Sequence, residues 1–291
     1  MRKNIVYYSV IMFLVACAGC SSPWARNVRI SDGILNHGRE SRQNAASNAA
    51  SEFRRTDFSE KNLERYPDPS LNHVFKALNR MSFLFPENGL YISLQQDILT
   101  EKKRRGKYAE AEIKQMFTAY LRARMFDKAY AIKKQFPLIE LPALPVKIVD
   151  NLPEKTAGRA YGVSKDGKEV EMTALSLGTG PKLVMVMFTG CSVAEKAMGQ
   201  IMEDPELSAA FKKYGILLTA SFDAQGIAKW KQDHSFSEVY IVNKISDFAM
   251  FDFRSSPDFY FLKDGRLIAK SYGWGRKSKE ELRKTLGRIF F

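Results

Sequence analysis

The chain has 291 residues, 45% of them hydrophobic and 26% charged, with a formal net charge of +13 at pH 7. These fractions are ordinary for a globular protein, and the length allows one large domain or two smaller ones. The positive charge favours contact with membrane headgroups, polyanions or acidic proteins without choosing among them. The sequence holds no nucleic-acid motif, no glycine-rich phosphate loop and no spaced Cys/His cluster. We therefore expect no nucleic-acid partner, no cofactor and no metal site.

The N-terminus predicts a lipoprotein signal peptide over residues 1–16. A basic start precedes an apolar stretch from Ile5 to Ala16, which is too short to span a bilayer comfortably. The stretch ends in Leu14-Val15-Ala16-Cys17, which resembles the bacterial lipobox. The resemblance implies cleavage before Cys17 and attachment of lipid, such as diacylglycerol and palmitate, to that residue. Because Ala18 rather than Asp follows, it also implies the periplasmic face of the outer membrane. An ordinary signal sequence is the alternative.

The next two segments predict a tether and a helical region. Residues 17–60 include the small, polar run "SRQNAASNAASEF", which indicates a flexible tether that holds a folded body off the membrane. Residues 61–140 show helical spacing of apolar side chains, as in "SLNHVFKALNRMSFLF", with Ser70 as a candidate cap and a break at Pro86-Glu87-Asn88-Gly89. The basic run Lys102–Lys107 is interpreted first as a solvated helix end and second as a binding patch.

The proline-rich run "FPLIELPALPVK" marks a domain boundary, after which residues 141–291 predict an α/β domain. Leu183 to Phe188 is a continuous apolar run, as expected for a buried central strand. His234 is predicted to end a helix on the surface. The remaining predicted elements are a hairpin around Asp166-Gly167, helices over 192–202, 205–214 and 224–234, strands over 216–221 and 238–242, a hairpin around Asp264-Gly265 and a last helix capped by Ser278.

Three sequence motifs follow one another in residues 141–291. They are "KLVMVMFTGCSVA", an apolar strand ending at a cysteine, "YGILLTASFDAQGIAKW", a strand and a helix, and "SSPDFYFLKDGRLI", a proline before a hairpin. Their order and spacing resemble the thioredoxin superfamily, in which a central strand ends at a reactive cysteine opening a helix and a later cis-proline precedes a hairpin. The resemblance implies a central mixed sheet flanked by helices, preceded here by the all-helical region, and a cis bond between Ser256 and Pro257.

The family's site depends on a thiolate, which a helix N-terminus stabilises through its dipole and free N–H groups. The resemblance makes Cys191 the nucleophile and implies contacts to a substrate polypeptide from Gly190, Ser192, Ala194, Ser256 and Pro257. Ala194 stands where the family has a second, resolving cysteine. Met185 stands at the place of the buried acid that many thioredoxins carry.

These residues favour exchange of disulfides by a single thiol, of the isomerase or reductase type, on exported proteins that carry thiols or disulfides. A redox-inactive binding module for an envelope protein is the alternative, with Cys191 as a small buried apolar side chain. A peroxidase would need a threonine where Phe188 stands, and a cluster-binding glutaredoxin site does not match Cys-Ser-Val-Ala.

Overall fold

The protein is described by a computed structural model, which covers residues 22–36, 48 and 52–290. It divides into two compact units, Met1–Ala77 and Leu78–Phe291, which are described separately below. The proposed signal peptide and Cys17 lie outside the described residues. Within the described part, no helix combines the length and apolarity needed to cross a membrane.

The first unit places a helix where the sequence predicts a tether. Helix α1 (Pro23–Asn36) buries Asn27, Ile30, Ser31 and Ile34, which recur at the spacing of one helix face. The Asn27 amide donates to the Tyr66 hydroxyl at 2.9 Å. The prediction of a flexible tether is therefore wrong for residues 23–36. The remaining elements of this unit are η1 (Arg55–Phe58), α3 (Glu60–Leu63) and the start of α4 (Asp68–Leu84), which begins before the candidate cap Ser70.

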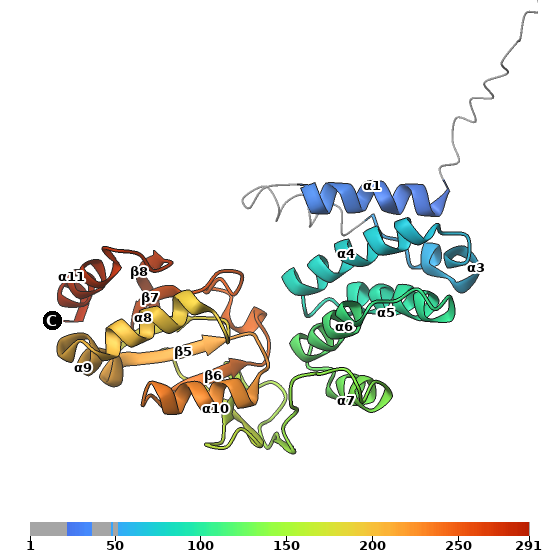
Figure 1. The fold of residues 1–291 in the computed structure, drawn as a ribbon. Coiled ribbons are helices and arrows are strands. Elements are labelled where there is room, and N and C mark those ends of the chain that lie inside the picture. The colour runs from blue at the N-terminus through green and yellow to red at the C-terminus, as the bar shows by residue number, and fades with distance from the viewer. Residues whose placement is uncertain (1–21, 37–47, 49–51, 291) are drawn as a thin grey trace, which may run out of the picture. The chain divides into compact units, whose positions relative to one another are not determined.

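The second unit begins with the end of α4 and three further helices, α5 (Gly89–Arg104), α6 (Glu110–Arg122) and α7 (Phe126–Gln135) (Figure 1). The predicted break between α4 and α5 is confirmed, and the Asn88 side chain caps α5 by accepting from the Leu90 N–H at 3.1 Å. The interpretation of Lys102 as solvated is wrong. Lys102 exposes 3% of its surface and forms an ion pair with Glu112 of α6.

A mixed sheet follows the helices. Within the described residues it has eight strands in the order β1-β3-β2-β6-β5-β4-β7-β8, so that β1 and β8 are its edges. Strands β4, β5 and β6 run parallel, and β7 is antiparallel to β4 and β8. The strands are β1 (Lys147–Val149), β2 (Arg159–Val163), β3 (Glu169–Ala174), β4 (Pro181–Val186), β5 (Gly215–Thr219), β6 (Val239–Val242), β7 (Asp258–Lys263) and β8 (Arg266–Tyr272).

Alternate side chains of the central strands pack on opposite sides of this sheet. Val184 and Val186 of β4 share one core with Tyr260 of β7, whose ring meets that of Phe251 edge-to-face, with 5.0 Å between ring centres. On β7, the alternate residue Phe259 packs against Trp274 at 5.5 Å. The helices around the sheet confirm the predicted order of α8 (Ser192–Met202), α9 (Pro205–Tyr214), α10 (Ala224–Asp233) and α11 (Ser278–Phe290) (Figure 1). The short η2 (Ser246–Phe248) was not predicted from the sequence.

Arg124, in the turn between α6 and α7, joins the helices to the sheet. Its guanidinium donates to the carbonyl of Leu121 at 2.6 Å, to that of Ala220 at 3.2 Å and to that of Val242. The last two carbonyls lie at the carboxyl ends of β5 and β6. Burial lowers the pKa of Arg124 to about 10, so the side chain stays protonated at neutral pH and keeps donating. Arg124 thereby links the helices α6 and α7 to the ends of strands β5 and β6.

We expect Arg124→Ala and Arg124→Gly each to lower the free energy of unfolding by about 1–3 kcal/mol, because the strand-end carbonyls lose their donor. Arg124 has a φ of 59°, a conformation that glycine adopts freely, so the glycine variant separates the guanidinium from the backbone. Urea unfolding measures the effect, with Lys134→Ala on the exposed face of α7 as control. A glycine variant as stable as the parent chain would contradict this role.

Candidate functional site

The site is built where β4 ends and α8 begins. Beyond Val186, the Met187 N–H still donates to the Leu218 carbonyl of β5 at 3.0 Å, after which the chain turns. Gly190 makes this turn with a φ of 76°, a conformation that side-chain-bearing residues rarely adopt. Cys191 is the N-cap residue of α8, and its backbone carbonyl accepts a hydrogen bond from the Glu195 N–H at 3.0 Å. The sulfur therefore lies at a helix N-terminus, where backbone N–H groups and the helix dipole favour negative charge.

The loop before β7 lies directly against this cysteine. Ser256 and Pro257 are joined by a cis peptide bond, as the sequence predicts. The Cys191 Sγ lies 3.6 Å from the Ser256 carbonyl oxygen, to which the thiol donates. The Ser256 hydroxyl accepts from the Phe188 N–H at 3.0 Å. Two hydrogen bonds thus join the Ser256-Pro257 loop to the Phe188–Cys191 loop.

The structure brings the other predicted contact residues to the same place. Gly190 and Ser192 are exposed on either side of Cys191, which is half-buried and free. Val193, which the sequence did not single out, exposes 40% of its surface there. Ala194 is fully buried beneath Cys191's helix turn, at the place of a resolving thiol. Met185 is also fully buried, and β4 has no acidic residue.

A buried acid is nevertheless present on the neighbouring strand. Asp258, the first residue of β7, pairs with Val186 across the ladder and exposes 1% of its surface. Its carboxylate accepts from the Ser255 hydroxyl and from the Gly273 N–H, the latter at 3.4 Å. Burial raises the pKa of Asp258, and these two hydrogen bonds partly oppose the rise. In the sequence analysis, a buried acid was considered only at Met185 on β4. The one sequence signal for Asp258 is its position directly after Pro257.

A second acidic group lies one helical turn from Cys191. The Glu195 carboxylate is 2.8 Å from Nε2 of His234, whose ring stacks on Trp230 at 4.5 Å. His234 ends α10 at its C-cap, as predicted, but its side chain is only 12% exposed, so the predicted surface position is wrong. The pair ties the first turn of α8 to the end of α10.

Strand order, helix order, the cysteine at the N-terminus of α8 and the cis-proline loop define the C-terminal part as thioredoxin-like. The protein is accordingly a thioredoxin-like α/β protein preceded by a helical region. The arrangement presents one accessible thiol beside a backbone carbonyl of an extended loop. Chemically, a thiol so placed can attack a disulfide, whereas Ala194 can supply no second sulfur.

No protein-family description and no curated protein matches the sequence. Among solved structures, the exposed lipoprotein thioredoxin of Streptococcus pneumoniae aligns with 45% of this chain and 99% of its own, at 16% identity and a TM-score of 0.32. A thioredoxin-like protein from Bacteroides caccae aligns with 98% of this chain and 99% of its own, at 12% identity and a TM-score of 0.31. The fold assignment is carried by the strand order and the cis-proline loop of the chain itself.

The raised pKa of Asp258 predicts a pH-dependent stability. The folded protein keeps a proton on Asp258 at pH values where an unfolded carboxyl, with a pKa of about 3.9, has lost it. The stability contributed by the protonated acid is therefore lost as the pH rises from about 4 through the raised folded pKa. Asp258→Asn removes this titration, so we expect the parent chain to lose stability relative to the variant over that window.

Urea unfolding between pH 3 and 8 measures the difference. Asp166→Asn is the matched control, because hydrogen bonds from the Lys168 N–H and the Ser164 hydroxyl lower the pKa of that carboxyl. The difference in unfolding free energy between the parent chain and Asp166→Asn should therefore change with pH in the opposite direction. A difference for Asp258→Asn that stays constant across the range would contradict the prediction.

Proposed function

We propose that the protein is a membrane-anchored, thioredoxin-like lipoprotein that exchanges disulfides on exported proteins through the single thiol of Cys191. The observation that carries the proposal is the Cys191 sulfur at the N-terminus of α8, 3.6 Å from the carbonyl that precedes the cis-proline. A thiolate at that position is stabilised by the helix terminus. The residue proposed to act chemically is Cys191 alone, with Gly190, Ser192, Ser256 and Pro257 contacting the substrate chain.

In the proposed reaction, the Cys191 thiol loses its proton to solvent and the thiolate attacks one sulfur of a substrate disulfide. A bond forms between that sulfur and Cys191, the substrate's sulfur–sulfur bond breaks, and the leaving thiolate takes up a proton. Because Ala194 has no sulfur, release needs a second thiol from outside the active-site helix. Attack by another thiol of the substrate isomerises its disulfides, whereas attack by an external low-molecular-weight thiol, followed by a second, reduces them.

The proposed location follows from the N-terminal sequence. Leu14-Val15-Ala16-Cys17 supports cleavage and lipidation at Cys17, and Ala18 supports the outer membrane. A lipid at the N-terminus attaches a protein to the membrane surface without a membrane-spanning segment. The thioredoxin-like part would therefore act on proteins exported to the periplasm.

A redox-inactive binding module is the second candidate. One observation favours it: the Cys191 thiol already donates to the Ser256 carbonyl, the group that an extended substrate backbone would need. In that case, the loops around Cys191 would serve as a contact surface, and the sulfur would stay protonated.

Trapping of mixed disulfides separates the two candidates. With no resolving thiol, the parent chain should hold partner proteins covalently, and non-reducing gels should show adducts that Cys191→Ser abolishes. Ala194→Cys should release the adducts and raise disulfide reductase activity at least tenfold, because the second thiol then attacks within the same helix turn at an effective concentration in the range of about mM or higher.

Alkylation of Cys191 provides the control for this experiment. Rapid reaction with iodoacetamide at neutral pH, lost in Cys191→Ser, shows that the thiol is accessible. If alkylation is slow and no adduct forms in the parent chain, the proposed exchange function is wrong, and the result supports the redox-inactive binding module.

The anchor has its own test. We expect Cys17→Ser to abolish incorporation of labelled palmitate and to leave the precursor uncut or the chain soluble, because the lipid attaches to that sulfur. Metabolic labelling followed by membrane fractionation measures both effects, and Cys20→Ser is the matched control that should keep the label. Equal labelling of the parent chain and Cys17→Ser would assign the lipid elsewhere.

A further inference from the structure

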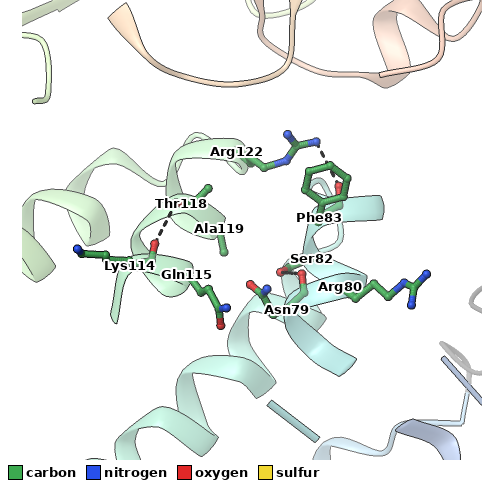
Figure 2. A pocket seen from close by; sticks show the side chains of 9 residues that line it. All are labelled: Asn79, Arg80, Ser82, Phe83, Lys114, Gln115, Thr118, Ala119 and Arg122. Carbon is green, nitrogen blue, oxygen red and sulfur yellow. Dashed lines mark hydrogen bonds between the residues drawn. The ribbon is translucent and has the colours of Figure 1, made fainter. Parts of the chain in front are cut away.

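The helical part of the second unit contains a groove with a cationic lining. The end of α4 and the length of α6 enclose a pocket of about 410 Å³. Figure 2 shows its two walls, one from each helix. The lining residues are Asn79, Arg80, Ser82, Phe83, Lys114, Gln115, Thr118, Ala119 and Arg122. They include three cations, two side-chain amides and no carboxylate, so the lining favours an anionic occupant.

Arg122 is a buried cation with unused hydrogen-bonding capacity. It exposes 7% of its surface, and its guanidinium lies over the Phe83 ring at 4.1 Å (Figure 2). One terminal nitrogen donates to the Phe83 carbonyl at 3.2 Å. Its Nε is buried and has no hydrogen-bond partner among the described residues. A buried donor without an acceptor is costly, so an acceptor brought by a ligand stabilises this arrangement.

The electrostatic surroundings of Arg122 differ from those of its neighbour Arg124. Arg124 also has an unpaired Nε, yet its terminal nitrogens serve three backbone carbonyls and it does not line the groove. Burial lowers the pKa of Arg122 to about 10, and no neighbouring carboxylate among the described residues counteracts this decrease. At the rim, Lys114 pairs with Glu110 at 2.6 Å, an exposed contact that a ligand carboxylate can replace at small cost.

The groove is next to the thiol loop. Phe83, which forms its wall, packs edge-on against Phe188 at 6.2 Å between ring centres. Phe188 accepts the Cys191 N–H on its carbonyl at 3.2 Å and donates its own N–H to Ser256. An extended chain advances about 3.3–3.6 Å per residue, so a cysteine a few residues from a segment in the groove reaches Cys191.

We propose that this groove docks an acidic, partly apolar segment of the partner polypeptide and presents a neighbouring cysteine of that partner to Cys191. Carboxylates of the segment bind Arg122 and Lys114, and its apolar side chains lie against Phe83 and Ala119. Docking stands independently of thiol chemistry. Delivery to Cys191 is the step that rests on the proposed function.

The test measures docking without a thiol. The probe is a fluorescein-labelled, acetylated and amidated dodecapeptide that alternates Asp and Glu with Leu and Phe and contains no cysteine. Its counterpart replaces Asp and Glu by Asn and Gln. Fluorescence anisotropy with the full chain carrying Cys191→Ser should give an affinity for the acidic peptide at least about tenfold higher than for the neutral one, as expected for charge-assisted hydrogen bonds.

Groove variants locate the binding. Lys114→Glu, which reverses a rim charge, and Thr118→Trp, which fills the groove without changing its charge, should each weaken binding at least about tenfold. Lys134→Glu on the exposed face of α7 is the matched control and should change the affinity less than about twofold. Arg122→Gln should weaken binding and Arg122→Lys should restore part of it. If Arg122→Gln does not fold, Lys114→Glu and Thr118→Trp still decide the question.

Four results would overturn the proposal. The first two are equal affinity for the acidic and neutral peptides, and equal weakening by Lys134→Glu and Lys114→Glu. The third is displacement of the peptide by millimolar sodium glutarate, which would make this a small-anion site, and the fourth is self-association that competes with the peptide, which would assign the groove to a second copy of the chain. Exchange with neutral 2-hydroxyethyl disulfide, measured on Lys114→Glu with Cys191 intact, should be unchanged. If the parent chain also fails to exchange with 2-hydroxyethyl disulfide, both the proposed exchange function and the delivery of a cysteine to Cys191 are wrong. Docking of the acidic segment is then still supported by the anisotropy measurements.

Discussion

The antiparallel register between β4 and β7 is the constraint on which the site depends. Val186 stands opposite Asp258 in this ladder, so the loop that follows β4 meets the loop that precedes β7. Cys191 and Ser256, 65 residues apart, come within hydrogen-bond distance for this reason. A slip by one residue would move every side chain of β7 to the other face of the sheet and shift Ser256 away from Phe188 and Cys191. Tyr260 and Phe259 pack on opposite sides of the sheet against different partners, and this difference between the two faces of β7 specifies the register.

The sequence predicted most of the α/β part, because its strands are apolar runs bounded by turn residues and its helices carry capping residues such as Asp204. The cis-proline and the Cys191 turn were implied by the resemblance of two motifs to the thioredoxin superfamily. Helix α1 was missed because its four buried positions lie in a segment otherwise rich in polar residues. Asp258 was missed because the acid comes from a strand distant in the sequence, and Lys102 because its partner Glu112 lies on another helix. Such long-range pairs leave no local pattern.

Two arginines two residues apart show how differently buried cations can be used. The guanidinium of Arg124 supplies donors to carbonyls at the ends of two strands and so has a structural role. Arg122 lies over an aromatic ring with one backbone acceptor, and its remaining capacity is unused within the described residues. Both arginines are desolvated and each has an unpaired Nε, but three backbone carbonyls accept from Arg124, whereas a single carbonyl accepts from Arg122. The helical region therefore supports the sheet through Arg124 and lines the groove with Arg122.

Strand β8 has consequences for how copies of the protein meet. It is an edge of the sheet, its Leu267, Ile268 and Tyr272 are exposed, and its free backbone groups could add a strand from another molecule. Arg266 and Lys270 are exposed on the same strand. Two such edges brought together antiparallel would set cations against cations, in a chain whose formal net charge is already +13. The edge thereby resists self-aggregation at low ionic strength, and salt, which screens these charges, weakens that protection.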